Sequence, residues 1–255
     1  MLVDCHLHST FSSDAQSPIL EMCGSAVRKG VSVVCFTEHV DMNPADSNYG
    51  FYNHADYSAE IERAKSIFDG KLEILQGIEF AEPHLYPRDF ETMTRRKFDF
   101  VLGSVHTFQG TWAGAEDILQ KYSADEIYDL HYAETLKMVG FGGFDAIAHM
   151  DLPRRYIPKS REPIALIDSI LSALIRSGIA LELNSSPLRK GLEFSLPSPA
   201  ILRRYRELGG KSVTLGSDAH HADDICSGMD HLLEQAASHR LAPVYFRGRS
   251  PIPAA

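Results

Sequence analysis

The sequence is poor in cysteine, in positive charge and in long hydrophobic runs, and each scarcity excludes a class of protein. Its 255 residues include four cysteines, too few and too widely spaced for a disulfide framework or a CxxC zinc site. No segment approaches the roughly 18 apolar residues of a membrane span, and the first residues lack the basic start of a signal peptide. We therefore expect a cytoplasmic protein with reduced thiols and no contact with membranes.

Lysine and arginine are outnumbered by acidic residues, 25 to 34, which leaves a net charge of −9 at pH 7. This balance disfavours a protein built to hold nucleic acid or anionic lipid. The remaining composition, with 44% hydrophobic and 23% charged residues, is ordinary for a folded protein. The sequence has no heptad pattern that would indicate an oligomeric state, which therefore stays open.

Short β-rich segments alternate with segments of helical period along the whole chain. The predicted strands are Leu2–His6, Val31–Thr37, Leu72–Phe80, Phe98–Val105, Phe144–His149, Ile179–Asn184 and Ser212–Ser217. The predicted helices are Ile19–Lys29, Tyr57–Phe68, Ala124–Val139, Ile164–Ser177 and Pro199–Leu208. This alternation indicates parallel βαβ units, and seven strands favour a closed, TIM-like α/β barrel. We expect a single barrel domain over residues 1–240, with residues 241–255 as a closing segment and tail.

Twelve histidines are the most unusual feature of the sequence, since lysine and arginine together number only 25. Six of the seven predicted strands end in side chains that can bind a metal ion. These side chains are His6 with His8, His39, Glu79, His106, His149, and Asp218 with His220. The carboxyl ends of parallel strands open on the same face of a barrel, where barrel enzymes have their active sites. The sequence therefore predicts a metal site on that face.

The spacing His6-x-His8 supports this prediction. Strand residues alternate between two faces, so both imidazoles lie on one side of the backbone and can hold one cation. The pair Asp218-x-His220 repeats the spacing on the last strand, which neighbours the first strand in a closed barrel. By the same alternation, Cys5 is expected to face the helices as a core thiol.

With Asp14 included, the predicted site has nine donors, six imidazoles and three carboxylates. Asp14 also suits a simpler role as a loop or helix-capping residue before Ser17-Pro18. Imidazole with carboxylate favours Zn, Mn or Fe, and nine donors are enough for two or three divalent ions. The positive charge of such ions exceeds the negative charge of the three carboxylates. The pocket would therefore bind hydroxide and an anionic substrate, and phosphate fits this description best. Glu38 is expected to orient the adjacent His39.

The strand-end residues belong to motifs that follow one another along the chain. These are Asp4-x-His6-x-His8-Ser9 with Asp14, Thr37-Glu38-His39, Gly77-Ile78-Glu79, Gly103-Ser104-Val105-His106, Ala148-His149-Met150-Asp151 and Gly216-Ser217-Asp218-Ala219-His220. The ordered set resembles the PHP (polymerase and histidinol phosphatase) family over nearly the whole chain, to about residue 235. Arg154-Arg155-Tyr156 and Glu182-Leu183-Asn184 are similar to the histidinol-phosphatase branch of that family.

The resemblance implies a distorted seven-stranded barrel that holds three metal ions. It places His6, His8, Glu79 and Asp218 around the first ion, Glu79, His106 and His149 around the second, and Asp14, His39 and His220 around the third. It also implies a phosphomonoesterase that hydrolyses L-histidinol phosphate in histidine biosynthesis, by attack of a metal-bridging hydroxide on phosphorus. Glu79, Asp218 and His220 would then be the catalytic residues.

Phosphate is commonly bound by arginine, whose planar guanidinium can donate two parallel hydrogen bonds. Arg155, in the predicted loop 154–162, and Arg189 follow the fifth and sixth strands on the predicted active face. We predict that they bind the substrate phosphate; the alternative is a pair of solvent-exposed charges. Asn184 ends the sixth strand and is predicted to donate a hydrogen bond to the substrate, unless it only shapes the turn before Pro187.

Other functions are compatible with parts of this pattern. A PHP-type phosphoesterase acting on nucleotides or other small phosphates would keep the metal site and change the substrate. Amidohydrolase-like hydrolysis is disfavoured, because it usually requires a lysine at the end of a middle strand, where this chain has Glu79, His106 and His149. A metal-binding protein without catalysis would have broken ligand motifs, and none of the motifs is broken here.

Overall fold

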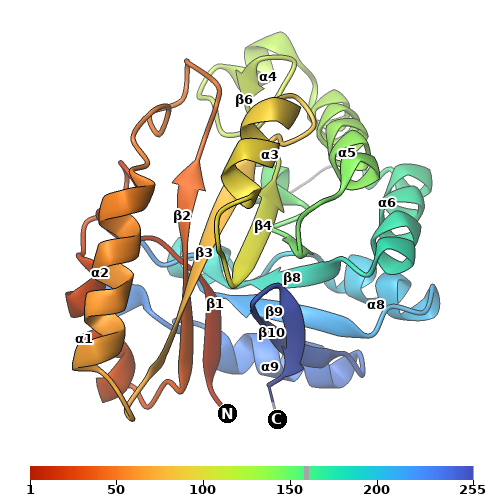
Figure 1. The fold of residues 1–255 in the computed structure, drawn as a ribbon. Coiled ribbons are helices and arrows are strands. Elements are labelled where there is room, and N and C mark those ends of the chain that lie inside the picture. The colour runs from red at the N-terminus through yellow and green to blue at the C-terminus, as the bar shows by residue number, and fades with distance from the viewer. Residues whose placement is uncertain (158–160, 255) are drawn as a thin grey trace.

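The computed structural model describes residues 1–157 and 161–254. Residues 158–160, in the predicted loop 154–162, and residue 255, at the end of the predicted tail, lie outside the described residues. Strands and helices alternate along the described chain, and the helices are arranged around the strands (Figure 1). The sequence therefore predicted the order of the main elements correctly.

Parallel strands form the central sheet of the described residues. Those that match the predicted segments are β1 (Val3–Leu7), β2 (Val33–Val40), β3 (Glu73–Ala81), β4 (Phe100–Ser104), β7 (Ala146–Ile147), β8 (Ala180–Asn184) and β9 (Ser212–Gly216). Their order in the sheet follows their order in the chain, and each pairs in parallel with the next. β7 is shorter than predicted at both ends, and the backbone beyond it leaves the extended region at His149, where φ is +24°.

The sheet closes at its carboxyl end, where β1 and β9 meet. There the N–H of Asp218 donates to the carbonyl of His6 at 2.8 Å. At the amino end, β9 pairs in parallel with β10 (Ala242–Arg247), and β11 (Ser250–Pro253) pairs antiparallel with β10. The prediction of a distorted α/β barrel is thereby confirmed: the rim that holds the predicted site is closed, and a hairpin occupies the opposite end.

Helices cover the outer face of this sheet (Figure 1). The α-helices of the described residues are α1 (Ile19–Arg28), α2 (His54–Ile67), α3 (Pro87–Thr94), α4 (Ile118–Lys121), α5 (Ala124–Phe141), α6 (Ile164–Ser177), α7 (Ser186–Arg189), α8 (Pro199–Glu207) and α9 (Met229–Ser238). The short α7, which follows β8 directly, lies at the carboxyl rim instead, and short 3-10 helices are formed by Leu152–Arg155 and Ala222–Asp224. Two very short strands, β5 (Thr107–Phe108) and β6 (Thr111–Trp112), form a separate hairpin near the rim. None of the helices in the described part of the chain has the length and apolar character of a membrane span.

Local signals explain several helix boundaries. Ser123 caps α5 by accepting a hydrogen bond from the N–H of Glu126, whose carboxylate accepts from the N–H of Ser123. α6 ends at Gly178, which adopts a φ of +68° that costs little without a side chain. The helices α3, α4, α7 and α9 were not predicted.

Two apolar clusters fill the protein, one on each face of the sheet. The larger cluster contains the buried faces of the helices together with outward-facing strand residues such as Leu7. The smaller cluster is built from β1 to β4, β7, β8 and β10, and it includes Cys5, Val33 and Tyr245. Cys5 therefore faces the barrel interior, and the expectation that it faces the helices was wrong.

A bulge in β1 explains this difference. Asp4 pairs with Val34 and Leu7 pairs with Phe36. Between these two pairs β1 contains one residue more than β2. Such an extra residue resets the alternation of side chains between the two faces. Cys5 and the histidines that follow it can thus all point into the barrel.

Candidate metal centre

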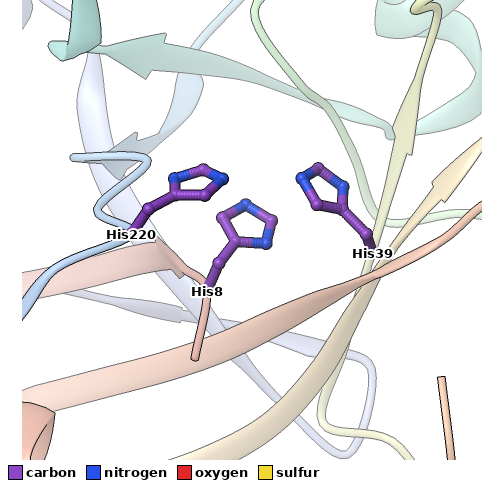
Figure 2. Close-up of side chains that lie close together, drawn as sticks. All are labelled: His8, His39 and His220. Carbon is purple, nitrogen blue, oxygen red and sulfur yellow. The ribbon is translucent and has the colours of Figure 1, made fainter. Parts of the chain in front are cut away.

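Eight of the nine predicted ligands fall into four overlapping groups of three at the carboxyl rim of the barrel. Within each group the ligating atoms lie within 4.8 Å of one another. The groups are His8, His39 and His220; His6, His149 and Asp218; His6, His8 and Glu79; and His39, Glu79 and His106. Figure 2 shows the first group, in which three imidazoles from different segments point toward a common space.

Glu79 lies at the centre of the cluster, in β3, with no exposure to solvent. Its Oε1 is 2.9 Å from Nε2 of His149 and 3.3 Å from Nε2 of His106. Its Oε2 is 3.2 Å from Nε2 of His6 and 3.2 Å from Nδ1 of His39. One carboxylate thus faces imidazoles from four segments, the arrangement that a ligand bridging two ions requires.

The imidazoles of His6 and His8 direct their Nε2 atoms at each other, 2.9 Å apart. Oδ1 of Asp218 is 3.8 Å from the first of these nitrogens and 3.6 Å from the second. His6 donates its Nδ1–H to Oε1 of Glu182 at 2.6 Å, so in the neutral form that binds metal its lone pair is on Nε2. Two ring nitrogens and a carboxylate around one space fit a divalent cation such as zinc.

Asp14 reaches the outer edge of the cluster from the loop before α1. Its Oδ2 is 3.3 Å from Nε2 of His220 and 3.6 Å from Nε2 of His39. Burial by itself raises the pKa of Asp14, but these two imidazoles outweigh it and hold the pKa well below its ordinary range. The alternative role as a helix cap is not seen, because the N-cap of α1 is Pro18.

Electrostatics favour the metal-binding form of the carboxylates and of His8, but not of every imidazole. Burial by itself raises the pKa of Glu79, but neighbouring imidazoles, His6 first, hold it well below its ordinary value. The same balance lowers the pKa of Asp218. Burial lowers the pKa of His8, and the imidazole of His39 lowers it further. The carboxylates are therefore ionised and His8 is neutral, as ligands must be.

The imidazoles of His6, His39 and His106 differ from that of His8. Burial alone would lower the pKa of His6, His39 and His106, yet the neighbouring carboxylates outweigh it and raise the pKa well above its ordinary value. A bound metal therefore has to displace a proton from these rings.

Buried acids outside the predicted set support the histidines. Glu38 accepts a hydrogen bond from Oγ of Ser12 at 2.6 Å, and that hydroxyl oxygen accepts from the backbone N–H of His39 at 3.0 Å. The expected link between Glu38 and His39 thus runs through Ser12. Oδ1 of Asp41 lies 3.5 Å from Nδ1 of His106. Sequence reasoning missed Asp41, although its position two residues after His39 places it on the same face.

The cluster lines one side of a cavity of about 740 Å³. Arg155 is in the wall of this cavity, and its Nη2 donates to Oγ of Ser186 at 2.5 Å and to Oδ2 of Asp218 at 2.8 Å. The Nε–H of the same guanidinium is buried without a hydrogen-bond partner among the described residues. This donor is therefore available to an acceptor on a ligand in the cavity.

The other two predicted substrate contacts are engaged within the protein. Arg189 lines the cavity, but its guanidinium donates to the backbone carbonyls of Ser217 and Asp218, and so holds the loop after β9. Asn184 is fully buried, and its Oδ1 accepts from the N–H of Ser186 at 3.0 Å and from its O–H at 2.6 Å. Asn184 thus positions a cavity hydroxyl, and contact of either residue with substrate stays a prediction.

A family model described as PHP domain matches residues 4–186 of the chain. The chain belongs to the PHP domain family. Two members named probable histidinol-phosphatase are similar to it along most of their length. The Clostridium acetobutylicum protein is 29% identical over 98% of both chains, and the Deinococcus radiodurans protein is 30% identical over 88% of both. The resemblance to the histidinol-phosphatase branch is therefore confirmed.

A solved PHP structure has the same fold. The histidinol phosphate phosphatase of Lactococcus lactis, complexed with zinc, L-histidinol and phosphate, matches with a TM-score of 0.88 and 24% identity over 98% of each chain. The distorted barrel is thus the fold of this PHP domain protein as well.

Proposed function

We propose that this PHP domain protein is a metal-dependent phosphomonoesterase that hydrolyses L-histidinol phosphate to L-histidinol and phosphate. The observation that carries the proposal is a cluster of histidines and carboxylates beside a cavity whose wall includes Arg155, and Nε–H of Arg155 has no hydrogen-bond partner in the described part of the chain. Relatives named histidinol-phosphatase, which match nearly the whole chain, support the substrate.

Two or three divalent ions, Zn, Mn or Fe, suit this donor set. The proposed ligands are His6, His8, Glu79 and Asp218 for the first ion, Glu79, His106 and His149 for the second, and Asp14, His39 and His220 for the third. When bound, ions of this kind acidify a water molecule and neutralise the charge that develops on phosphoryl oxygens. The Lactococcus lactis relative was solved with zinc, which supports that metal among the three.

The side chains of this protein have distinct proposed roles in the reaction. Nε–H of Arg155 donates to a phosphoryl oxygen, while its Nη2 stays on Asp218 and keeps that carboxylate in place. His220 uses Nδ1–H on the carbonyl of Asp218 at 2.9 Å, so its Nε2 is directed to Asp14 at the outer edge of the cluster. This edge adjoins the cavity, where the leaving alcohol would depart. None of these roles requires a covalent nucleophile from the protein.

The remainder of the cavity suits a small cationic alcohol. Asp46 contributes negative charge to its lining, whereas Asp224 lies 3.6 Å from Nε of Arg189. Lys190 lies over the ring of Tyr156. Trp112 and Tyr156 form an aromatic wall, with ring centroids 5.4 Å apart. Carboxylates and aromatic faces attract ammonium and imidazolium groups and would repel additional phosphates. Asp46 and Trp112 would thus face a cationic alcohol, while the preference for histidinol phosphate over a nucleotide is supported by the relatives named histidinol-phosphatase.

Phosphate release tests the proposal directly. L-histidinol phosphate is compared with a panel of nucleotides and sugar phosphates, with Mn, Zn or Fe supplied and a chelated control. We expect a preference for L-histidinol phosphate of about 100-fold or more in kcat/KM, equivalent to about 2.7 kcal/mol, and loss of activity on chelation. Broad, weak turnover of the whole panel would contradict this substrate and favour a phosphoesterase acting on other small phosphates.

A further inference from the structure

Glu182, in the middle of β8, receives hydrogen bonds from three N–H groups although it is only 1% exposed. Its Oε1 accepts from Nδ1–H of His6 at 2.6 Å. Its Oε2 accepts from the backbone N–H of His149 at 2.7 Å and from Nδ2–H of Asn184 at 3.2 Å. A single buried carboxylate thus joins two proposed metal ligands, one in β1 and one just after β7.

The two ligands depend on this carboxylate in different ways. For His6, the bond at Nδ1 fixes the tautomer, so that Nε2 presents its lone pair toward Glu79 and His8. For His149, the bond fixes the backbone at a residue whose φ of +24° is unusual for a side chain of this size. Its imidazole can then place Nε2 at 2.9 Å from Oε1 of Glu79.

The neighbouring strand leaves room for this carboxylate. Gly216 on β9 pairs with Asn184, and a Cβ added there would clash with Oε1 of Glu182 and lie 2.6 Å from Cβ of His6. Any side chain at this position would displace one of the two groups. A glycine at this point of β9 is thus required by the contact between Glu182 and His6.

We propose that Glu182 is a positioning residue that sets the metal affinity of the centre, because it holds the ring of His6 and the backbone of His149 in the positions that metal binding requires. It touches neither substrate nor reacting atoms, so it acts through the two histidines. The inference rests on the metal centre of the proposed function and is independent of which phosphate ester is the substrate.

Glu182→Gln tests the proposal with nearly the same shape. A glutamine has one acceptor oxygen and an NH₂ group, so it cannot accept from both His6 and His149 and presents a donor to one of them. We expect zinc affinity to fall by about 10- to 100-fold. The measurement is competition for Zn²⁺ alone against a chromophoric chelator, with no phosphate ester present.

Asp99→Asn is the matched control. Asp99 lies at the amino end of the barrel, where its two oxygens accept from the backbone N–H groups of Gln76 and Gly248, each at 3.0 Å. This variant loses an equivalent pair of hydrogen bonds far from the metal centre, so we expect a lower Tm with unchanged zinc affinity. If zinc binding weakened equally in Glu182→Gln and Asp99→Asn, Glu182 would have only a general structural role, and the proposal would be overturned.

Gly216→Ala provides a second variant in case Glu182→Gln does not fold. It keeps the carboxylate and pushes it away from His6, so zinc affinity should fall here too. Wild-type affinity in a folded Glu182→Gln protein, or in Gly216→Ala if only that variant folds, would overturn the proposal. If the wild-type protein bound no zinc, manganese or iron, the proposed metal centre itself would be contradicted. If it bound metal normally but did not hydrolyse L-histidinol phosphate, only the proposed substrate would be contradicted.

Discussion

The imidazole rings of His8 and His220 stack with their centroids 4.3 Å apart, although the two residues lie near opposite ends of the chain. They meet because β1 and β9 pair at the carboxyl rim, where the N–H of His8 donates to the carbonyl of Ala219 at 2.9 Å. The metal centre is therefore complete only when the barrel is closed. Binding of metal and closure of the barrel are expected to stabilise each other.

Metal removal should accordingly lower the Tm. A ligand at 100 times its Kd stabilises the folded state by about 2.7 kcal/mol. In a chain of this size each kcal/mol shifts the Tm by about 2–4 °C, so chelation should cost roughly 5–10 °C. Calorimetry before and after chelation, and again after zinc is restored, measures this. An unchanged Tm in protein shown to have lost its metal would contradict the coupling.

Glu79→Gln should abolish both metal binding and activity. The substitution removes the buried charge that faces imidazoles from four segments, and it leaves an NH₂ group against one or more of their nitrogens. We expect kcat to fall by more than about 100-fold, with a matching loss of bound metal. Elemental analysis and phosphate release measure the two effects. Glu91→Gln, on the exposed side of α3, is the control and should change neither.

Arg155→Lys should weaken catalysis while the charge is retained. A lysine cannot contact Asp218, Ser186 and a phosphoryl oxygen at once, because it lacks the planar set of donors. Loss of one hydrogen bond to a charged group costs about 1.5–3 kcal/mol, which corresponds to a decrease of roughly 10- to 150-fold in kcat/KM. Steady-state kinetics measure this decrease. Arg204→Lys, in an exposed pair with Asp168, should have wild-type kinetics; equal kinetics in the two variants would exclude Arg155 from the reaction.

His131, in α5, should make the protein sensitive to acid. Burial lowers its pKa from 6.5 to about 4, against the effect of the hydrogen bond from Nε2–H to the carbonyl of Met150 at 3.0 Å. As the pH falls below 6.5, His131 becomes protonated in the unfolded chain, whereas in the folded chain it stays neutral until about pH 4. The free energy of unfolding should therefore fall as the pH decreases through this window, by up to about 3 kcal/mol.

Denaturant unfolding of chelated protein at several pH values between 7 and 4 measures this loss. His131→Gln keeps a donor for the carbonyl of Met150 and cannot be protonated, so its free energy of unfolding should decline less over the same window. Parallel curves for the two proteins would show that His131 does not contribute to acid sensitivity.

Local sequence patterns predicted the fold and the location of the site. α6 has the predicted bounds Ile164–Ser177, because its apolar period is regular and Gly178 ends it. The strand ends were predictable since each follows a short apolar run, and the parallel arrangement puts every such end on one rim. The helix α9 was missed and the length of β7 was overestimated. In both segments the sequence has no boundary signal as strong as Gly178 at the end of α6.

The sequence by itself thus determined which residues reach the rim and which chemistry they bring, since both depend on alternation along single strands and on residue type. Only the tertiary structure decided how they combine. The bulge in β1 turned Cys5 inward, closure of the barrel brought His8 to His220, and the sheet placed Glu182 between His6 and His149. These relationships depend on the curvature of the sheet and on the register between distant strands, which no local pattern contains.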